Sequence, residues 1–175
     1  MTNGYHKENE EVLYANADIN IVCDGNIKEL KNLSEDNPRQ RIRLCAHTDQ
    51  NDLLHEMLIV HKKNTYVRPH KHLGKSESTH IIEGLVDIIV FNDDGRIEQV
   101  ISMGDYASGK AFYFRMSKPF FHTLLIRSEI LVFHEITNGP FDRRTTLFAP
   151  WAPDESDAQV VTNFRAGLEL RLKNF

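Results

Sequence analysis

The sequence has no apolar run that approaches the roughly 20 residues needed to cross a bilayer. The chain opens with MTNGYHKENEEV, a stretch that also lacks the apolar core of a signal peptide. These two absences predict a cytoplasmic protein with no membrane partner.

Concentrated charge of one sign is also missing. The 21 Lys and Arg residues and the 25 Asp and Glu residues give a formal net charge of −4 at pH 7, and the basic residues are scattered along the chain. A protein that binds the phosphate backbone of nucleic acid needs a basic face. The sequence therefore predicts no nucleic-acid partner.

Cysteine, glycine and proline are all scarce. The two cysteines, Cys23 and Cys45, lie far apart and form no Cys-x-x-Cys pair, so we expect reduced thiols and no disulfide. Nine glycines, six prolines and 41% hydrophobic residues are typical of a globular chain rather than a disordered one. A length of 175 residues suits one domain with a single core.

Short runs of β-branched and aromatic residues, broken by turn signals, fill the chain from Arg41 onward. They include RIRLCAH, EMLIVH, STHIIEG, LVDIIVF, AFYFRM, HTLLIR and ILVFHEI. Between two of these runs, Asp94 and Gly95 provide the positive φ angles of a tight hairpin. Closely spaced strands of this kind predict a mainly β protein, built as an antiparallel barrel or sandwich.

Helical spacing appears near the two ends of the chain. In residues 26–33 the apolar side chains recur at helical intervals, and Pro38 follows soon after. In the tail from Asp154, a candidate N-cap, apolar residues about four apart form one face; they are Val160 or Val161, Phe164, Leu168 and Leu172. We therefore expect an N-terminal extension with a short helix (1–40), a β-barrel (41–150), and a C-terminal strap and helix (151–175) packed on the same single domain.

A histidine-rich stretch, residues 68–84, reads RPHKHLGKSESTHIIEG and holds the densest group of candidate ligands. His70 and His72 are two residues apart, so in an extended strand both side chains project from one face. The four residues before Glu77 include Gly74, which tolerates a chain reversal. A reversal there brings the carboxylate beside the two imidazoles, and the spacing predicts three metal ligands on two neighbouring strands.

The full pattern, His-x-His-x4-Glu-x6-Gly, ends at Gly84 and resembles the first motif of the cupin superfamily. Asn64 stands where that motif has an upstream glycine, and Asn tolerates left-handed backbone angles better than most residues. Of the second cupin motif, only the histidine is clearly present, at His122. In the family this histidine completes the metal shell, so the resemblance implies that His122 is a fourth ligand beside the three residues of the first motif.

Further blocks resemble the WbuC-type cupin fold metalloproteins. In chain order they are Asn37–His47, Thr65–His72, Phe91–Ile97, Phe120–Leu124, His134–Phe141 and Phe148–Pro153. The resemblance implies a cupin-type antiparallel β-barrel, or jelly roll, with a short N-terminal helix and a C-terminal helix. It also implies a small bacterial protein whose genes tend to lie among those for O-antigen or other surface polysaccharides, in a family that mostly lacks an assigned reaction.

Several polar residues near the histidines are candidates for ligand binding. Arg68 lies in step with the two histidines and Tyr66 shares its parity, so both are candidate substrate-binding residues. The alternative is a surface position, because Pro69 disturbs the alternation. His80 falls on the strand face opposite Glu77, which places it outside the ligand shell.

Four residues outside the motif are left with two interpretations. Arg41, Arg43 and His47 either line the mouth of the barrel or form ion pairs on an edge strand. Glu135 is interpreted as a carboxylate that faces solvent or lies next to the ligands, rather than as a ligand itself.

Three neutral imidazoles and one carboxylate around a divalent ion leave a net charge of about +1 and one or two positions for water. Such a site suits Fe, Mn, Zn, Ni or Co, and it favours a small anionic molecule or a sugar. With the polysaccharide association, we expect a metal-dependent isomerase or epimerase of a sugar or nucleotide sugar. The alternatives are an iron-dependent dioxygenase and a non-catalytic metal- or sugar-binding module. Cupins commonly pair through strand edges, so we also expect a homodimer.

Overall fold

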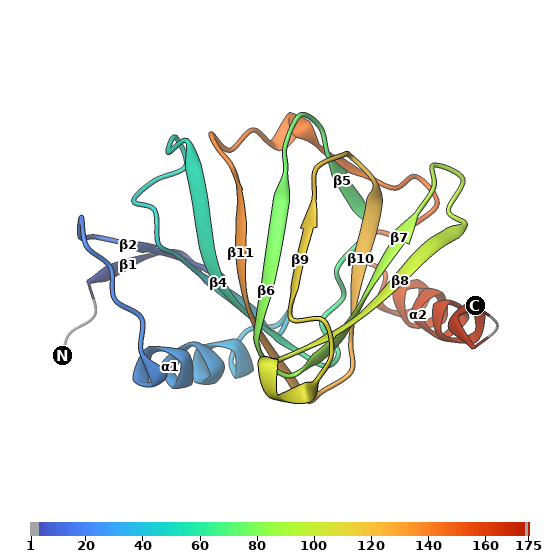
Figure 1. The fold of residues 1–175 in the computed structure, drawn as a ribbon, viewed down its shortest axis with the longest axis horizontal. Helices are drawn as coiled ribbons and strands as arrows, with labels where there is room; N and C mark the ends of the chain where they lie inside the picture. The colour runs from blue at the N-terminus through green and yellow to red at the C-terminus, as the bar shows by residue number, and fades with distance from the viewer. Residues whose placement is uncertain (1–3, 174) are drawn as a thin grey trace.

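The computed structural model describes residues 4–173 and 175, and it contains two β-sheets that face each other (Figure 1). The large sheet holds, in spatial order, β1 (Tyr5–Asn9), β2 (Val12–Ala15), β3 (Arg41–Cys45), β4 (Leu54–Lys62), β11 (Ile130–Asn138), β6 (Glu77–Glu83) and β9 (Tyr113–Met116). The small sheet holds β12 (Thr146–Phe148), β5 (His70–His72), β10 (Phe121–Ile126), β7 (Leu85–Phe91) and β8 (Ile97–Gly104).

Eight of these strands form a jelly roll. The order β4-β11-β6-β9 in one sheet faces β5-β10-β7-β8 in the other, and all pairs within each set are antiparallel. Along the chain from β4 to β11, every connection changes sheet except the β7–β8 hairpin. This double Greek-key arrangement confirms the mainly β, jelly-roll fold of the cupin type.

The first strands enlarge one sheet in a way that the sequence did not predict. The hairpin β1–β2 and strand β3 continue the large sheet beyond β4, and β2 pairs with β3 in parallel. Helix α1 (Asp24–Glu35) connects β2 to β3, and a helical crossover of this kind leaves its two strands parallel. This parallel pair joins β3 to β2, which precedes the barrel, so the antiparallel barrel expected from Arg41 onward is unaffected.

The two α-helices cover the outer faces of the two sheets, α1 at the left of Figure 1 and α2 (Ala158–Leu172) at the right. Under α1, the fully buried Leu30 packs with Ile42 and Leu44 of the large sheet. Against the small sheet, α2 packs most of the apolar face that its spacing predicts, through Phe164, Leu168 and Leu172, and Val161 is also buried. Among the described residues, no helix has the length and apolarity that a membrane crossing requires.

The N-cap of α2 is Asp157, whose side chain accepts a hydrogen bond from the backbone N–H of Val160. The candidate Asp154 was therefore the wrong residue for this role. Its carboxylate instead accepts hydrogen bonds from Ser156, and this Asx-type turn delays the start of the helix.

Strand β7 shows why its sequence, LVDIIVF, is almost continuously apolar. Val86, Ile88 and Val90 point into the core between the sheets, whereas Ile89 and Phe91 pack on the other face in the cluster that includes α2. Both faces of the strand are thus covered, so the polar alternation of a half-exposed strand is absent.

Gly84 lies at the turn from β6 to β7 and has a φ of +93°. A Cβ atom at this position would lie 2.3 Å from the carbonyl oxygen of Ile130. The glycine of the histidine motif therefore has a structural cause, because only a residue without a side chain fits both the angle and the space.

Candidate metal centre

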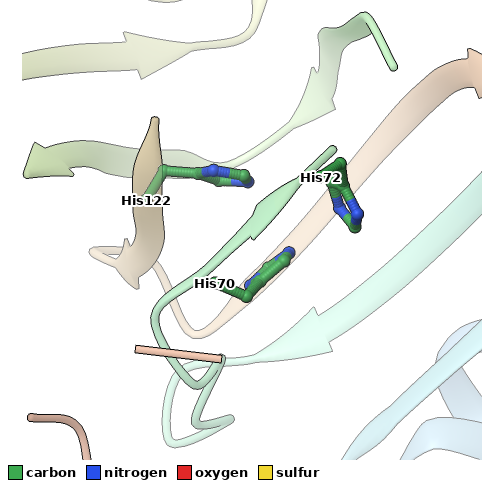
Figure 2. A group of neighbouring side chains, drawn as sticks. All are labelled: His70, His72 and His122. Carbon is green, nitrogen blue, oxygen red and sulfur yellow. The ribbon is translucent and has the colours of Figure 1, made fainter. Parts of the chain in front are cut away.

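Three imidazoles converge at one end of the small sheet (Figure 2). His70 and His72 belong to β5, and His122 of β10 lies directly opposite His70 in the sheet. The ring centroids of His70 and His122 are 4.6 Å apart, and those of His70 and His72 are 4.8 Å apart. One nitrogen from each ring lies within 4.8 Å of the others, a spacing suited to a shared metal ion.

A carboxylate from the opposite sheet meets these rings. Glu77 is the first residue of β6, and its Oε2 lies 3.3 Å from Nε2 of His72. Its Oε1 lies 3.6 Å from Nε2 of His122. The structure thus brings together all four residues that were expected as ligands, although metal binding by them stays a prediction.

The second nitrogen of each ring is held by a neighbouring oxygen. Nδ1 of His70 donates to the carbonyl of Arg68 at 2.8 Å, and Nδ1 of His122 donates to the carbonyl of Phe120 at 3.0 Å. Nδ1 of His72 is 3.0 Å from the hydroxyl of Thr146 on β12. Because metal-ligating histidines usually donate their other N–H in this way, the three Nε2 lone pairs are left to face the centre.

The Nε2 atom of His122 is the observation that tests the fit of a metal ion. It is buried and has no hydrogen-bond partner among the described residues. A buried polar atom without a partner costs free energy, and such exceptions often mark an ion or water that belongs there. A donor set of three imidazole nitrogens and one carboxylate oxygen fits a divalent transition metal.

Burial sets the protonation states around this centre. It lowers the pKa of both His70 and His72 to about 3 and also lowers the pKa of His122, so the three rings are neutral near pH 7. Neutral imidazole is the form that binds metals. Burial also raises the pKa of Glu77, since a carboxylate enclosed without a cation is poorly solvated. A bound cation would reverse that preference and favour the ionised carboxylate.

Glu135 is a second carboxylate on the inner face of the large sheet. It lies on β11 directly opposite Thr79 of β6, two residues along the strand from Glu77. Burial and then the charge of Glu77 raise its pKa, while the charge of Arg43 acts in the opposite direction. Sequence reasoning gave this residue no firm role, although Leu131 and Phe133, at alternate positions before it, signal the inner face.

Arg68 and Tyr66 contact the C-terminal strap. The guanidinium of Arg68 forms a 2.6 Å ion pair with Asp154 and lies over the ring of Phe148. The hydroxyl of Tyr66 donates to the carbonyl of Pro153. Their expected role in substrate binding stays a prediction, and it requires a ligand that joins or displaces these contacts.

The remaining candidates separate clearly in space. His80 is exposed on the outer face of the large sheet, directly opposite His134. Arg41 forms ion pairs with Glu11 and Glu155, and His47 is buried with its ring stacked on another imidazole, that of His55. Of Arg41, Arg43 and His47, Arg43 alone is exposed.

A cavity of about 560 Å³ lies away from the histidines, between α2 and the turn before β3. Arg39 and Glu155 line it and form a 2.7 Å ion pair with each other. These two charged groups are therefore already paired, and none of the three converging histidines lines the cavity.

Comparison with known proteins gives a family match without a function. Residues 22–103, somewhat less than half of the chain, match a family described as a domain of unknown function, DUF6016. This segment includes the first-motif residues but not His122. No curated protein matches the chain.

Solved structures with a similar fold are cupin-fold proteins. Protein SO0799 from Shewanella oneidensis is 11% identical, with a TM-score of 0.47 over 56% of this chain and 63% of its own. Bacillus subtilis oxalate decarboxylase is 14% identical, with a TM-score of 0.48 over 62% of this chain and 27% of its own. The Lactobacillus farciminis oxalate decarboxylase is 13% identical, with a TM-score of 0.44 over 55% of this chain and 27% of its own.

This chain therefore matches only about a quarter of the length of the two decarboxylases, and less than two thirds of the Shewanella protein. All three TM-scores lie below 0.5, so the jelly-roll assignment rests on the strand order described above. The likeness to these structures carries no information about the reaction.

Proposed function

We propose that His70, His72, Glu77 and His122 bind one divalent transition metal ion, and that this ion is the functional centre of the protein. The observation that supports it most is the arrangement of the imidazoles, whose Nδ1 atoms are held by fixed oxygens while the buried Nε2 of His122 has no hydrogen-bond partner in the described part of the chain. The metal identity is left open among Fe, Mn, Zn, Ni and Co.

The ligand set leaves a net charge of about +1 on a divalent ion and one or two positions for a small molecule. When bound, such an ion polarises a carbonyl group, stabilises an enediolate or lowers the pKa of bound water. Glu135 lies on β11 two residues from Thr137, the residue opposite Glu77, and burial raises its pKa. A carboxyl group in that state can hold or accept a proton beside the reacting molecule.

The reaction that we propose is an isomerisation or epimerisation of a sugar or nucleotide sugar in bacterial surface polysaccharide biosynthesis, such as that of O-antigen. It is supported by the open metal centre together with the blocks that resemble the WbuC-type cupins. The same resemblance supports a homodimer, and the absence of an apolar run supports a cytoplasmic location. The division into extension (1–40), barrel (41–150) and strap with helix (151–175) is part of the same proposal.

The experiment has two stages, and the first measures metal content. The purified protein is loaded anaerobically with each of the five metals and compared with the His72→Ala and Glu77→Ala variants. We expect about one ion per chain in the wild type and a large loss in both variants, with the fold retained by circular dichroism, because the apolar core does not depend on these side chains.

The second stage incubates the loaded protein with a panel of nucleotide sugars and follows the product by NMR. A new stereoisomer formed only by the loaded wild type is the expected result. Oxygen uptake by the iron form would instead identify a dioxygenase, and tight ligand binding without turnover would identify a non-catalytic binding module. Either of those outcomes contradicts the isomerase proposal.

A further inference from the structure

Lys75 lies between two of the proposed metal ligands, three residues after His72 and two before Glu77. The next residue, Ser76, donates its backbone N–H to the side-chain oxygen of Asn138 at 2.8 Å, so the chain already runs beside the end of β11 here. Side chains two residues apart in an extended chain share one side. Lys75 is therefore on the side of Glu77, which faces the interior of the sandwich at the end that holds the three histidines.

The ammonium of Lys75 donates to the carbonyl oxygen of Pro140 at 2.9 Å and forms no ion pair with any residue that the structure describes. Burial lowers the pKa of Lys75, and the charge of Asp142 partly opposes this effect. The carboxylate of Asp142 is already bound, however, because it accepts hydrogen bonds from the guanidinium of Arg144 at 2.8 to 3.2 Å. An ammonium has three N–H donors, so Lys75 keeps donors for an acidic group from outside.

The charge of Lys75 acts on residues of both sheets. Burial and the neighbouring imidazoles lower the pKa of His72, and the charge of Lys75 adds to this effect. Burial and then the same charge lower the pKa of His55 on β4. His55 lies opposite Thr137, which in turn lies opposite Glu77, so this histidine is level with the metal centre on the large sheet. The ammonium therefore lies near the end of the sandwich, beside the ligands of the small sheet and the matching end of the large sheet.

The metal centre is open to solvent on the side of His72. The side chain of His72 is 22% exposed, whereas those of Glu77 and His122 are 7% and 1% exposed. Lys75 is also partly exposed. Two residues of chain span at most about 8 Å between Cα atoms, so Lys75 and Glu77 are close enough for one small molecule to contact both the ammonium and the metal centre. A molecule that enters past His72 therefore meets the ammonium beside the centre.

We propose that Lys75 is a specificity-determining residue, whose ammonium binds the carboxylate or phosphate of an anionic sugar while other sugar oxygens face the metal centre. This inference rests on the proposed function of that centre and narrows its substrate class. A hydrogen bond between two charged groups is stronger than one between neutral groups. A neutral sugar of the same shape leaves the ammonium with the carbonyl of Pro140 alone, and therefore binds more weakly.

The test uses two matched pairs of probes: galacturonate with galactose, and glucose 1-phosphate with glucose. Binding to the Mn²⁺-loaded protein is followed by water-proton relaxation and by calorimetry, so that no turnover is needed. We expect at least one acidic probe to bind about tenfold more tightly than its neutral counterpart. Lys75→Met should weaken binding of that probe by about tenfold, the usual effect of losing a hydrogen bond to a charged group, and should leave the neutral probe unchanged. Lys75→Arg should keep most of the acidic affinity, because it keeps the charge and the N–H donors.

Lys71→Met is the matched control, because it removes the same charge from the same histidine motif. Lys71 lies on β5 between His70 and His72, but it points to the opposite side of the strand and pairs with Asp93 at 2.6 Å. This variant should bind both members of each pair as the wild type does. The proposal is overturned if no acidic probe binds better than its neutral partner, if Lys75→Met binds the acidic probe as tightly as the wild type, or if Lys71→Met weakens it equally. Metal content, measured on every variant, tests the proposed function separately: a wild type without metal contradicts that function, whereas loaded protein that is insensitive to Lys75→Met contradicts only the role of Lys75.

Discussion

Thr146 on β12 offers a sharp test of how the candidate metal centre is held. It lies directly opposite His72 in the small sheet, and its hydroxyl oxygen is 3.0 Å from Nδ1 of that ring. Thr146→Val keeps the shape of the side chain and removes only the oxygen. The ring of His72 then loses the partner that fixes both its tautomer and its orientation.

The structure sets the size of the expected effect. Loss of a residue that orients a metal-ligating histidine usually weakens metal binding by about 10- to 100-fold, or about 1.4 to 2.8 kcal/mol. The side chain of His72 is 22% exposed, so water can replace part of the lost hydrogen bond. We therefore expect a loss near the lower end of that range, about tenfold.

The assay is a Zn²⁺ or Mn²⁺ titration in competition with a chelator, and the matched control is Thr145→Val. The hydroxyl of Thr145 donates to the carbonyl of Asp142 instead of a histidine, so its loss should leave metal affinity unchanged. The reasoning is refuted if Thr146→Val binds metal as tightly as the wild type. Equal weakening by both variants would also refute it, because the effect would then come from the strand rather than from the hydrogen bond.

Three further predictions concern the fold and the inner carboxylates. Gly84→Ala should destabilise the protein by at least about 2 kcal/mol in chemical unfolding, because φ at this residue is +93° and the new Cβ would meet the carbonyl of Ile130. The control, Gly167→Ala, lies in α2 with open space around it and should stabilise the protein by up to about 1 kcal/mol. Burial lowers the pKa of His61 to about 3 in the folded protein, whereas an exposed histidine of the unfolded chain has a pKa of about 6.5. Between these two pH values protonation of this ring favours the unfolded chain, so the metal-free protein should lose stability as the pH falls from about 6.5 toward 3. Unfolding of His61→Leu should show a slope in that window that is smaller by up to about 1.4 kcal/mol per pH unit, and an unchanged slope would contradict the assignment. In elemental analysis, Glu77→Gln should lose most bound metal and Glu135→Gln should retain it. Loss of metal in Glu135→Gln but not in Glu77→Gln would show that Glu135, and not Glu77, is the carboxylate ligand.

Local patterns predicted the parts of the structure that local forces decide. The tight hairpin at Asp94–Gly95 needs a residue that accepts positive φ, and Gly95 adopts +79° there, whereas the positive φ expected of Asp94 is wrong. The two-residue spacing of His70 and His72 places both rings on one face, since that face is a property of the strand itself. The helix near the N-terminus was also predicted, although it extends beyond residues 26–33 at both ends.

Other features depend on contacts that no local pattern contains. The sequence of β1, YHKEN, is short and polar, and it is a strand only because β2 offers it a partner edge. His122 was expected only through resemblance, since pairing with β5 brings together residues that are distant in the sequence.

Metal stoichiometry in the wild type and in four single variants tests the central claim most directly. X-ray absorption of the loaded wild type should show about one divalent ion per chain, bound by three imidazole nitrogens and a carboxylate oxygen. His70→Ala, His72→Ala, His122→Ala and Glu77→Gln should each lose most of that ion. Variants that keep the wild-type metal content, or a wild type that binds none of the five metals, would contradict the account.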